Sequence, residues 1–178
     1  MTKTPATYIQ NPDQFLVESL ERLESVEYPR GTLLDVGCGT GVNAAYAASR
    51  GWTVTALDIY ETPRFPQGDY RYVQGALPNL PVRDASYNLV VCTGVLALLD
   101  VNTRKRSIQE LMRVVVSGGV VITDCIERDD DKYRGGVWNP RNLIIPFEEA
   151  QWEMDPFHNP INQGDTLRSQ QQILAFKP

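Results

Sequence analysis

Short apolar runs separated by segments of helical periodicity make up most of the chain. Five runs of β-branched and large apolar side chains predict strands, namely residues 32–36, 52–58, 70–74, 89–92 and 120–126. The alanine-rich residues 42–50 predict a helix that stops at Gly51. A second helix, closed by residues 118–119, is predicted by apolar positions at helical spacing, Ile108, Leu111, Met112 and Val115. This alternation predicts an α/β fold with a doubly wound, mostly parallel sheet and helices on both faces.

The flanking segments carry weaker patterns. Asn11, Pro12 and Gln14 form a helix start signal, with Asn11 as the N-cap and Pro12 in the first helical position. Apolar residues at helical spacing follow it, namely Phe15, Leu16, Leu20 and Leu23. Residues 134–145 are rich in Gly, Pro, Trp and Asn and predict a loop, and residues 172–177 predict a closing strand.

A glycine-rich turn follows the first predicted strand and carries the main functional signal. Gly37, Gly39 and Gly41 fall on alternate positions between that strand and the next helix, where glycine lets the backbone turn sharply and approach a ligand. A nicotinamide or flavin fingerprint would need a small residue where Val42 stands, and a P-loop would need Gly-Lys-Ser/Thr. A purely structural turn is a further alternative. Asp58, at the end of the second strand, favours a nucleotide site because a carboxylate there can accept from ribose hydroxyls.

At this point the chain resembles a known family. The sequence Leu-Asp-Val-Gly-Cys-Gly-Thr-Gly at residues 34–41, followed by Val-Thr-Ala-Leu-Asp at residues 54–58, resembles the class I S-adenosylmethionine-dependent methyltransferases. The resemblance continues in the same order to about residue 126. It implies a Rossmann-like methyltransferase fold of the seven-stranded type, with S-adenosylmethionine as cofactor and S-adenosylhomocysteine as product.

The resemblance also implies which residues bind the cofactor. Asp35 would order the turn or reach the amino-acid end of the cofactor, Asp58 would bind ribose, and Ile59 and Leu77 would wall the adenine, beside Ala76 in place of the acid that many members carry. The expected cofactor-binding residues are Asp35, Gly37, Cys38, Gly39, Thr40, Gly41, Asn43, Asp58, Ile59, Gly75, Ala76, Leu77, Cys92 and Thr93. Residues 60–69 hold two prolines and Gly68, so we expect the usual helix between the second and third strands to be short or missing.

Composition limits the partners. The 178 residues predict one methyltransferase domain, with residues 1–30 as an N-terminal helical segment and residues 127–178 as a variable, substrate-side segment with closing strands. A net charge of −5 argues against nucleic acid as a partner, and the lack of a long apolar run argues against a membrane. Three cysteines without disulfide-like spacing predict a reducing, cytoplasmic location. The oligomeric state is not predicted.

No metal site is expected. Side chains of the successive residues Asp129, Asp130 and Asp131 diverge, whereas a hard cation needs oxygens converging from separate elements. Cys38, Cys92 and Cys125 lie near strand ends, where small buried hydrophobes are the ordinary use of free cysteine. The basic triplet of residues 104–106 is expected to face solvent.

The sequence therefore predicts an enzyme that transfers a methyl group to a small molecule. The catalytic residue is unknown, with Tyr8 and His158 as candidates, and acceptor contacts are expected from Tyr8, Tyr133, Trp138 and His158. The acceptor atom, O, N, S or C, stays open. One alternative is a non-catalytic or degenerate cofactor-binding subunit that acts through a protein partner, and an NAD-dependent oxidoreductase is disfavoured by Val42.

Overall fold

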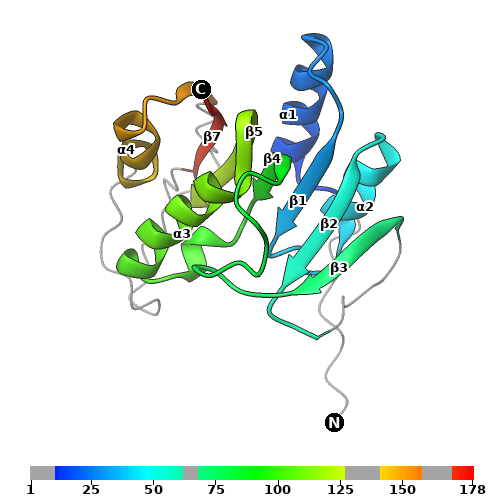
Figure 1. Cartoon of the computed structure of the whole chain (residues 1–178), viewed down its shortest axis with the longest axis horizontal. Helices are drawn as coiled ribbons and strands as arrows, with labels where there is room; N and C mark the ends of the chain where they lie inside the picture. The colour runs from blue at the N-terminus through cyan, green and yellow to red at the C-terminus, as the bar shows by residue number, and fades with distance from the viewer. Residues whose placement is uncertain (1–10, 62–67, 127–140, 158–169) are drawn as a thin grey trace, which may run out of the picture.

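Seven strands in one sheet organise the chain (Figure 1). The computed structural model describes residues 11–61, 68–126, 141–157 and 170–178. The strands are β1 (Thr32–Val36), β2 (Thr53–Asp58), β3 (Tyr70–Gln74), β4 (Tyr87–Cys92), β5 (Val115–Ile126), β6 (Glu153–Phe157) and β7 (Gln170–Phe176). The helices are α1 (Gln14–Ser25), α2 (Val42–Ser49), α3 (Val101–Val114) and α4 (Arg141–Glu149), with a short 3-10 turn, η1 (Leu96–Leu98).

The strand order is β3-β2-β1-β4-β5-β7-β6. Strands β1 to β5 pair in parallel, and β7 is inserted antiparallel to both β5 and β6. The order reverses between β1 and β4, which is the point where open α/β sheets bind ligands, beyond the carboxyl ends of their strands. The predicted fold class is confirmed.

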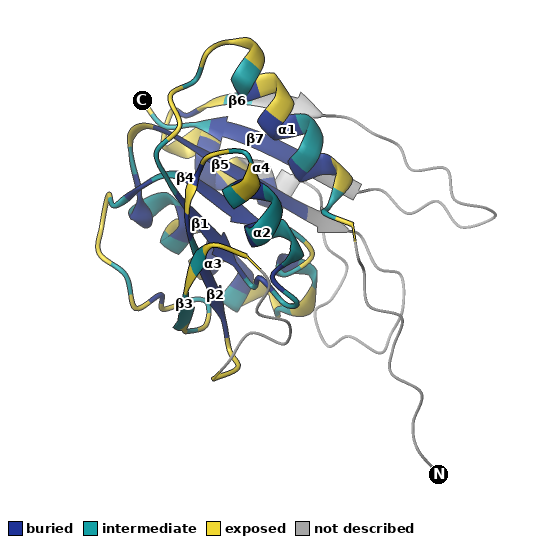
Figure 2. Ribbon diagram, turned by 90° about the vertical axis from the view of Figure 1, so that its right-hand side faces the viewer, coloured by how far each residue is buried: buried dark blue, intermediate teal, exposed yellow. Residues whose placement is uncertain are grey.

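Both faces of the sheet are buried, as the dark central strands in Figure 2 show. Successive side chains of β4 alternate between two cores: Val90 and Cys92 pack with α3 and α4, whereas Leu89 and Val91 pack with α1 and α2. This two-sided burial explains why the central strands read as continuous apolar runs instead of an apolar–polar alternation.

Two element junctions differ from the sequence prediction for a physical reason. The N-cap of α1 is Asp13, whose carboxylate accepts from the Leu16 N–H, and not Asn11. Helix α3 ends at Val114, and β5 begins at the next residue because Val115 pairs with Tyr87. Strand β5 then shifts its register on β4 over residues 116–119. Such long-range pairing leaves no signal in local periodicity.

The expected loop over residues 134–145 is wrong for its last five residues, which lie in α4. Leu143 and Phe147 are one helical turn apart and both fully buried, so tertiary packing favours a helix here although Pro146 interrupts its hydrogen bonding. The closing strand is confirmed as β7. Among the residues that are described between β2 and β3, 59–61 and 68–69, none is helical, and most of the segment expected to carry a short helix or none lies outside the described residues.

Several expected site residues lie outside the described parts of the chain. They are Tyr8, Tyr133, Trp138 and His158, together with the acid run of residues 129–131. Within the described ranges, no helix combines the length and the apolar character needed to cross a bilayer.

Candidate functional site

The glycine turn takes a backbone path that only glycine follows without strain. Gly37, Gly39 and Gly41 have φ of +73°, +55° and +81°, in the left-handed region. The N–H groups of Gly37 and Cys38 both donate to the Leu57 carbonyl, at 2.7 and 3.0 Å. The turn after β1 is thereby fixed to the end of β2.

Gly37 also allows a close contact between the turn and the segment after β4. A Cβ at this position would stand 2.3 Å from Cγ2 of Val95, well inside van der Waals contact. Gly37 and Val95 both line the cleft described below. The missing side chain therefore sets how closely two walls of that cleft approach.

Asp58 holds the same turn from the other side. Its Oδ2 accepts from the Gly39 N–H at 2.8 Å and its Oδ1 accepts from the Ile59 N–H at 2.7 Å. The side chain is 9% exposed and lies at the carboxyl end of β2. Each carboxylate oxygen accepts one backbone bond, which leaves lone pairs for the hydroxyl groups of a ligand.

Asp35 lies behind the glycine turn and holds the first turn of α2. It is 2% exposed and accepts a hydrogen bond from the Ala44 N–H in the first turn of α2, whose N-cap, Gly41, has no side chain to do so. Burial raises the pKa of Asp35 to about 7, and the nearby Asp58 adds to the rise. Of its two expected roles, the geometry favours ordering the turn, since Asp35 does not line the cleft.

A cleft of about 390 Å³ opens over the carboxyl ends of β1, β2, β3 and β4. Eight of the expected cofactor residues line it together. They are Gly37, Gly39, Asp58, Ile59, Gly75, Ala76, Leu77 and Thr93. The volume falls within the range of small-molecule sites.

Six other expected residues do not line the cleft. They are Asp35, Cys38, Thr40, Gly41, Asn43 and Cys92. Cys92 is fully buried, and its carbonyl accepts from the Thr123 hydroxyl at 2.9 Å. Burial also raises the pKa of the Cys38 thiol to about 12, so this thiol stays protonated at neutral pH.

Asn43 ties three elements together at the edge of the cleft. Its Nδ2 donates to the Thr93 hydroxyl at 3.3 Å, and its Oδ1 accepts from the Asp13 N–H at 2.8 Å. The start of α1 is thus fixed beside α2 and beside Thr93, which lines the cleft.

Apolar side chains at the rim are the part of the cleft that sequence reasoning missed. Tyr60, Val95, Leu98 and Leu99 line it alongside Ile59. Ile59 and Leu98 are 60% and 58% exposed, unusual for residues of this size. The apolar run at residues 95–99, directly after a buried strand, was the available signal. Exposed apolar surface beside a carboxylate suits a ligand with an apolar body and hydroxyl groups.

Two buried charged residues support the wall after β4. Asp124 Oδ1 accepts from the Gly94 N–H at 2.7 Å. Arg104 donates from Nε to the Leu96 carbonyl and from Nη2 to the Leu99 carbonyl, both at 2.8 Å. The expectation that residues 104–106 all face solvent is therefore wrong for Arg104, which is 5% exposed. The basic run gives no sequence signal that Arg104 is buried. Asp124, in contrast, stands inside an apolar predicted strand, which could have indicated its buried position.

Residues 59–60, directly after β2, are held by side chains of β3. The Tyr72 hydroxyl donates to the Tyr60 carbonyl at 2.9 Å, and Gln74 Nε2 donates to the Ile59 carbonyl at 3.0 Å. These bonds fix residues 59–60 at the mouth of the cleft.

A family profile described as a methyltransferase domain matches residues 34–123, about half of the chain. The chain belongs to this family. The predicted membership of the class I S-adenosylmethionine-dependent methyltransferases is confirmed, and with it S-adenosylmethionine as the cofactor of the family. The matched segment begins in β1 and ends in β5, so it contains the glycine turn, Asp58 and the wall after β4.

Named relatives of this methyltransferase domain share modest identity. The chain is 30% identical over 115 residues to a malonyl-[acyl-carrier protein] O-methyltransferase of Serratia marcescens, covering 62% of this chain and 44% of the relative. It is 28% identical over 145 residues to a ubiquinone biosynthesis O-methyltransferase of Rickettsia typhi, covering 72% and 57%. The chain thus spans about half the length of these relatives.

A solved structure shows the same fold. Magnesium protoporphyrin IX methyltransferase from Synechocystis PCC 6803, with bound S-adenosylhomocysteine, superposes with a TM-score of 0.71. The match covers 93% of this chain and 83% of that one at 14% identity.

The buried Asp35 makes stability depend on pH. In the folded chain the Asp35 carboxyl stays protonated up to about pH 7, whereas the ordinary pKa of this group is 3.8. The protonated carboxyl therefore stabilises the fold fully below about pH 4, and this stabilisation is lost as the pH rises to about 7. Asp35→Asn imitates the protonated acid at every pH. Between pH 5 and 7.5 the unfolding free energy of the wild type should therefore fall by about 3 kcal/mol relative to Asp35→Asn. Denaturant unfolding at both pH values measures this, with Asp69→Asn on the surface as control, and a difference that does not change with pH would contradict it.

Gly37 can be separated from ordinary glycine strain by a matched variant. Gly118 has the same φ of +73°, but a Cβ there would meet nothing within 4 Å. Gly118→Ala should cost about 1 kcal/mol of stability from the left-handed backbone alone. Gly37→Ala should cost about 1–3 kcal/mol more because Val95 must move, and should weaken binding of S-adenosylhomocysteine. Denaturant unfolding and calorimetry test both variants, and equal losses would disprove the contact.

Proposed function

We propose that this chain binds S-adenosylmethionine in the cleft over β1, β2, β3 and β4 and transfers its methyl group to a small-molecule acceptor. The observation that carries the proposal is the meeting of the glycine turn, Asp58 and the exposed apolar rim in one cleft of a methyltransferase-domain chain. The described residues fit the cofactor, since the site offers a carboxylate with spare lone pairs, a backbone free of side chains, and apolar walls.

Each part of the cleft has a proposed role in holding the cofactor. Asp58 accepts hydrogen bonds from the ribose hydroxyls. Ile59 and Leu77 cover the adenine, with Ala76 giving apolar contact in place of an acid. Thr93 and Gly94 lie against the methionine end, where Asp124 fixes the Gly94 backbone at 2.7 Å.

The proposed methyl transfer depends mainly on how the acceptor is placed relative to the methyl group of the cofactor. S-adenosylmethionine would supply an activated methyl group when bound, since its positively charged sulfonium makes the neutral thioether S-adenosylhomocysteine a good leaving group. The chain's own residues orient the acceptor and exclude water, which can provide much of the rate. The proposed acceptor contacts are Tyr8, Tyr133, Trp138 and His158, which lie outside the described ranges.

The acceptor atom in this proposal is oxygen. Both curated relatives are named as O-methyltransferases, which supports an oxygen nucleophile for this chain as well. A cytoplasmic location and the absence of a nucleic-acid partner remain part of the proposal, based on cysteine usage and the net charge of −5. A non-catalytic, partner-directed subunit and an NAD-dependent oxidoreductase are less favoured.

Calorimetric titration separates these functions. We expect S-adenosylmethionine and S-adenosylhomocysteine to bind the full chain with one site each and NAD not to bind. Transfer of a radiolabelled methyl group to a panel of carboxylic and phenolic acceptors then distinguishes an enzyme from a non-catalytic subunit. Binding of NAD alone would reject the proposal.

Asp58 provides the most direct test of the cleft. Asp58→Ala should raise the Kd for S-adenosylhomocysteine by about 10- to 100-fold, because charge-assisted hydrogen bonds to the ribose are lost. Asp69→Ala removes an exposed acid next to β3 and should leave the Kd unchanged. Calorimetry on both folded variants measures the effect, and an unaltered Kd for Asp58→Ala would remove Asp58 from the ribose role.

A further inference from the structure

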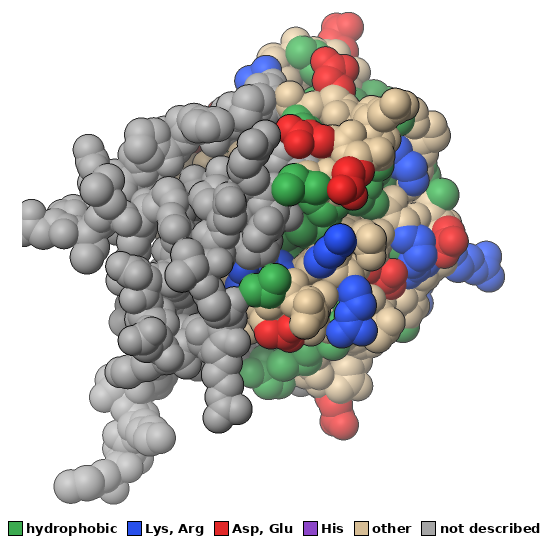
Figure 3. Space-filling view, turned by 90° about the vertical axis from the view of Figure 1, so that its left-hand side faces the viewer, with side chains coloured by type: hydrophobic (Ala, Val, Ile, Leu, Met, Phe, Trp, Pro, Cys, Tyr) green, Lys and Arg blue, Asp and Glu red, His purple; other side chains and the backbone are tan. Residues whose placement is uncertain are grey.

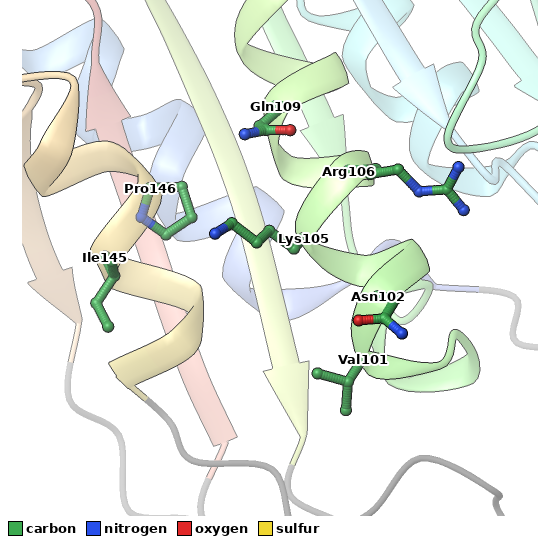
Figure 4. Close-up of a pocket in the computed structure, with 7 residues that line it drawn as sticks. All are labelled: Val101, Asn102, Lys105, Arg106, Gln109, Ile145 and Pro146. Carbon is green, nitrogen blue, oxygen red and sulfur yellow. The ribbon is translucent and has the colours of Figure 1, made fainter.

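A second hollow lies between α3 and α4, apart from the cofactor cleft. It has a volume of about 430 Å³ and shares no lining residue with the cleft. Its lining residues, labelled in Figure 4, are Val101, Asn102, Lys105, Arg106, Gln109, Ile145 and Pro146. We call it the α3–α4 groove.

One wall of the groove is a polar stripe on α3. Asn102, Lys105 and Gln109, with Arg106 beside them, follow the spacing i, i+3, i+4, i+7 that places side chains on one helical face. In Figure 4 the Lys105 and Gln109 side chains point toward α4, whereas the Arg106 guanidinium points away from it. Within the described residues, no ion pair involves Lys105.

The charge of the groove is opposite to that of the whole chain. None of the seven described residues that line it is acidic, although the net charge of the chain is −5. Figure 3, which faces this side of the molecule, shows Lys and Arg side chains next to hydrophobic ones, with Asp and Glu side chains on the same face. The Lys105 ammonium group, which points toward α4, favours an anionic ligand in the groove.

The other wall is apolar and exposed. Val101 and Ile145 are 39% and 37% exposed, and both line the groove. Leu98, 58% exposed, lines the cofactor cleft three residues before Val101. In Figure 4 the Val101 end of α3 lies beside the arrowhead of β5, at the sheet edge where the cofactor cleft opens. Two exposed apolar residues three positions apart, Leu98 and Val101, thus line the cleft and the groove respectively.

We propose that the α3–α4 groove binds an organic anion with an apolar body, whose charged group meets Lys105 and whose body lies on Val101 and Ile145. This ligand is the non-reacting end of the methyl acceptor, a statement that rests on the proposed function. The acceptor class is then an amphiphilic carboxylate or phosphate long enough to reach from the groove to the cleft.

Octanoate and its neutral analogue octanamide are the probes for the groove. In NMR titrations of the full chain we expect octanoate to shift the amide signals of residues 101–109, Ile145 and Phe147, and octanamide to bind about fivefold or more weakly. Lys105→Met should weaken octanoate binding by a similar factor. Arg83→Met, which removes an exposed charge away from the groove, should not change it.

Repeating the titration with saturating S-adenosylhomocysteine separates this inference from the proposed function. Octanoate should bind equally well in the presence of S-adenosylhomocysteine, because cleft and groove share no residue. Failure of S-adenosylhomocysteine to bind, with octanoate still in the groove, would reject the cofactor assignment and leave the anion site intact. Shifts that map elsewhere, equal binding of octanamide, or unchanged binding in Lys105→Met would overturn the anion site.

Discussion

The hydrogen bonds between the glycine turn and the end of β2 hold the functional edge of this protein together. Two N–H groups of the turn share the Leu57 carbonyl, and a third, that of Gly39, donates to Asp58. These bonds need consecutive amides aimed at a neighbouring strand, which requires the left-handed backbone at Gly37, Gly39 and Gly41. The positions of Asp58, of α2 and of the cleft floor all follow from this one constraint.

Three buried aspartates near this edge have different roles because their surroundings differ. Asp35 lies behind the turn, caps α2 and has a raised pKa, so its value to the fold depends on staying neutral. Asp58 lines the cleft and keeps lone pairs available for a ligand. Asp124 fixes the backbone of Gly94 and so shapes the opposite wall. Environment, rather than residue type, separates the structural acids from the proposed ligand-binding one.

The wall after β4 connects the two hollows of the molecule. Arg104 projects from the first turn of α3 back to the carbonyls of Leu96 and Leu99, so the helix that bounds the groove also positions the rim of the cleft. Asp100 caps the same helix by accepting from the N–H groups of Asn102 and Thr103. A ligand that spans both hollows would cross a segment held rigid from both ends.

The sequence alone determined the features that depend on local chemistry. The strands at residues 32–36 and 70–74 and the start of α2 at Val42 match the prediction, because short apolar runs and a glycine turn constrain the backbone locally. The fold class and the grouping of Asp58 with the glycine turn followed from the order of these elements, and the family followed from the resemblance of residues 34–41 and 54–58 to its motifs. Only the tertiary structure decided what depends on distant partners. It buried Arg104 but left Lys105 exposed, drew residues 141–145 into α4 through the packing of Leu143 and Phe147, and started β5 at Val115 by pairing it with Tyr87. It also placed the exposed side chains of the cleft and the groove, because exposure is set by which elements fail to cover a residue, and no local pattern records that.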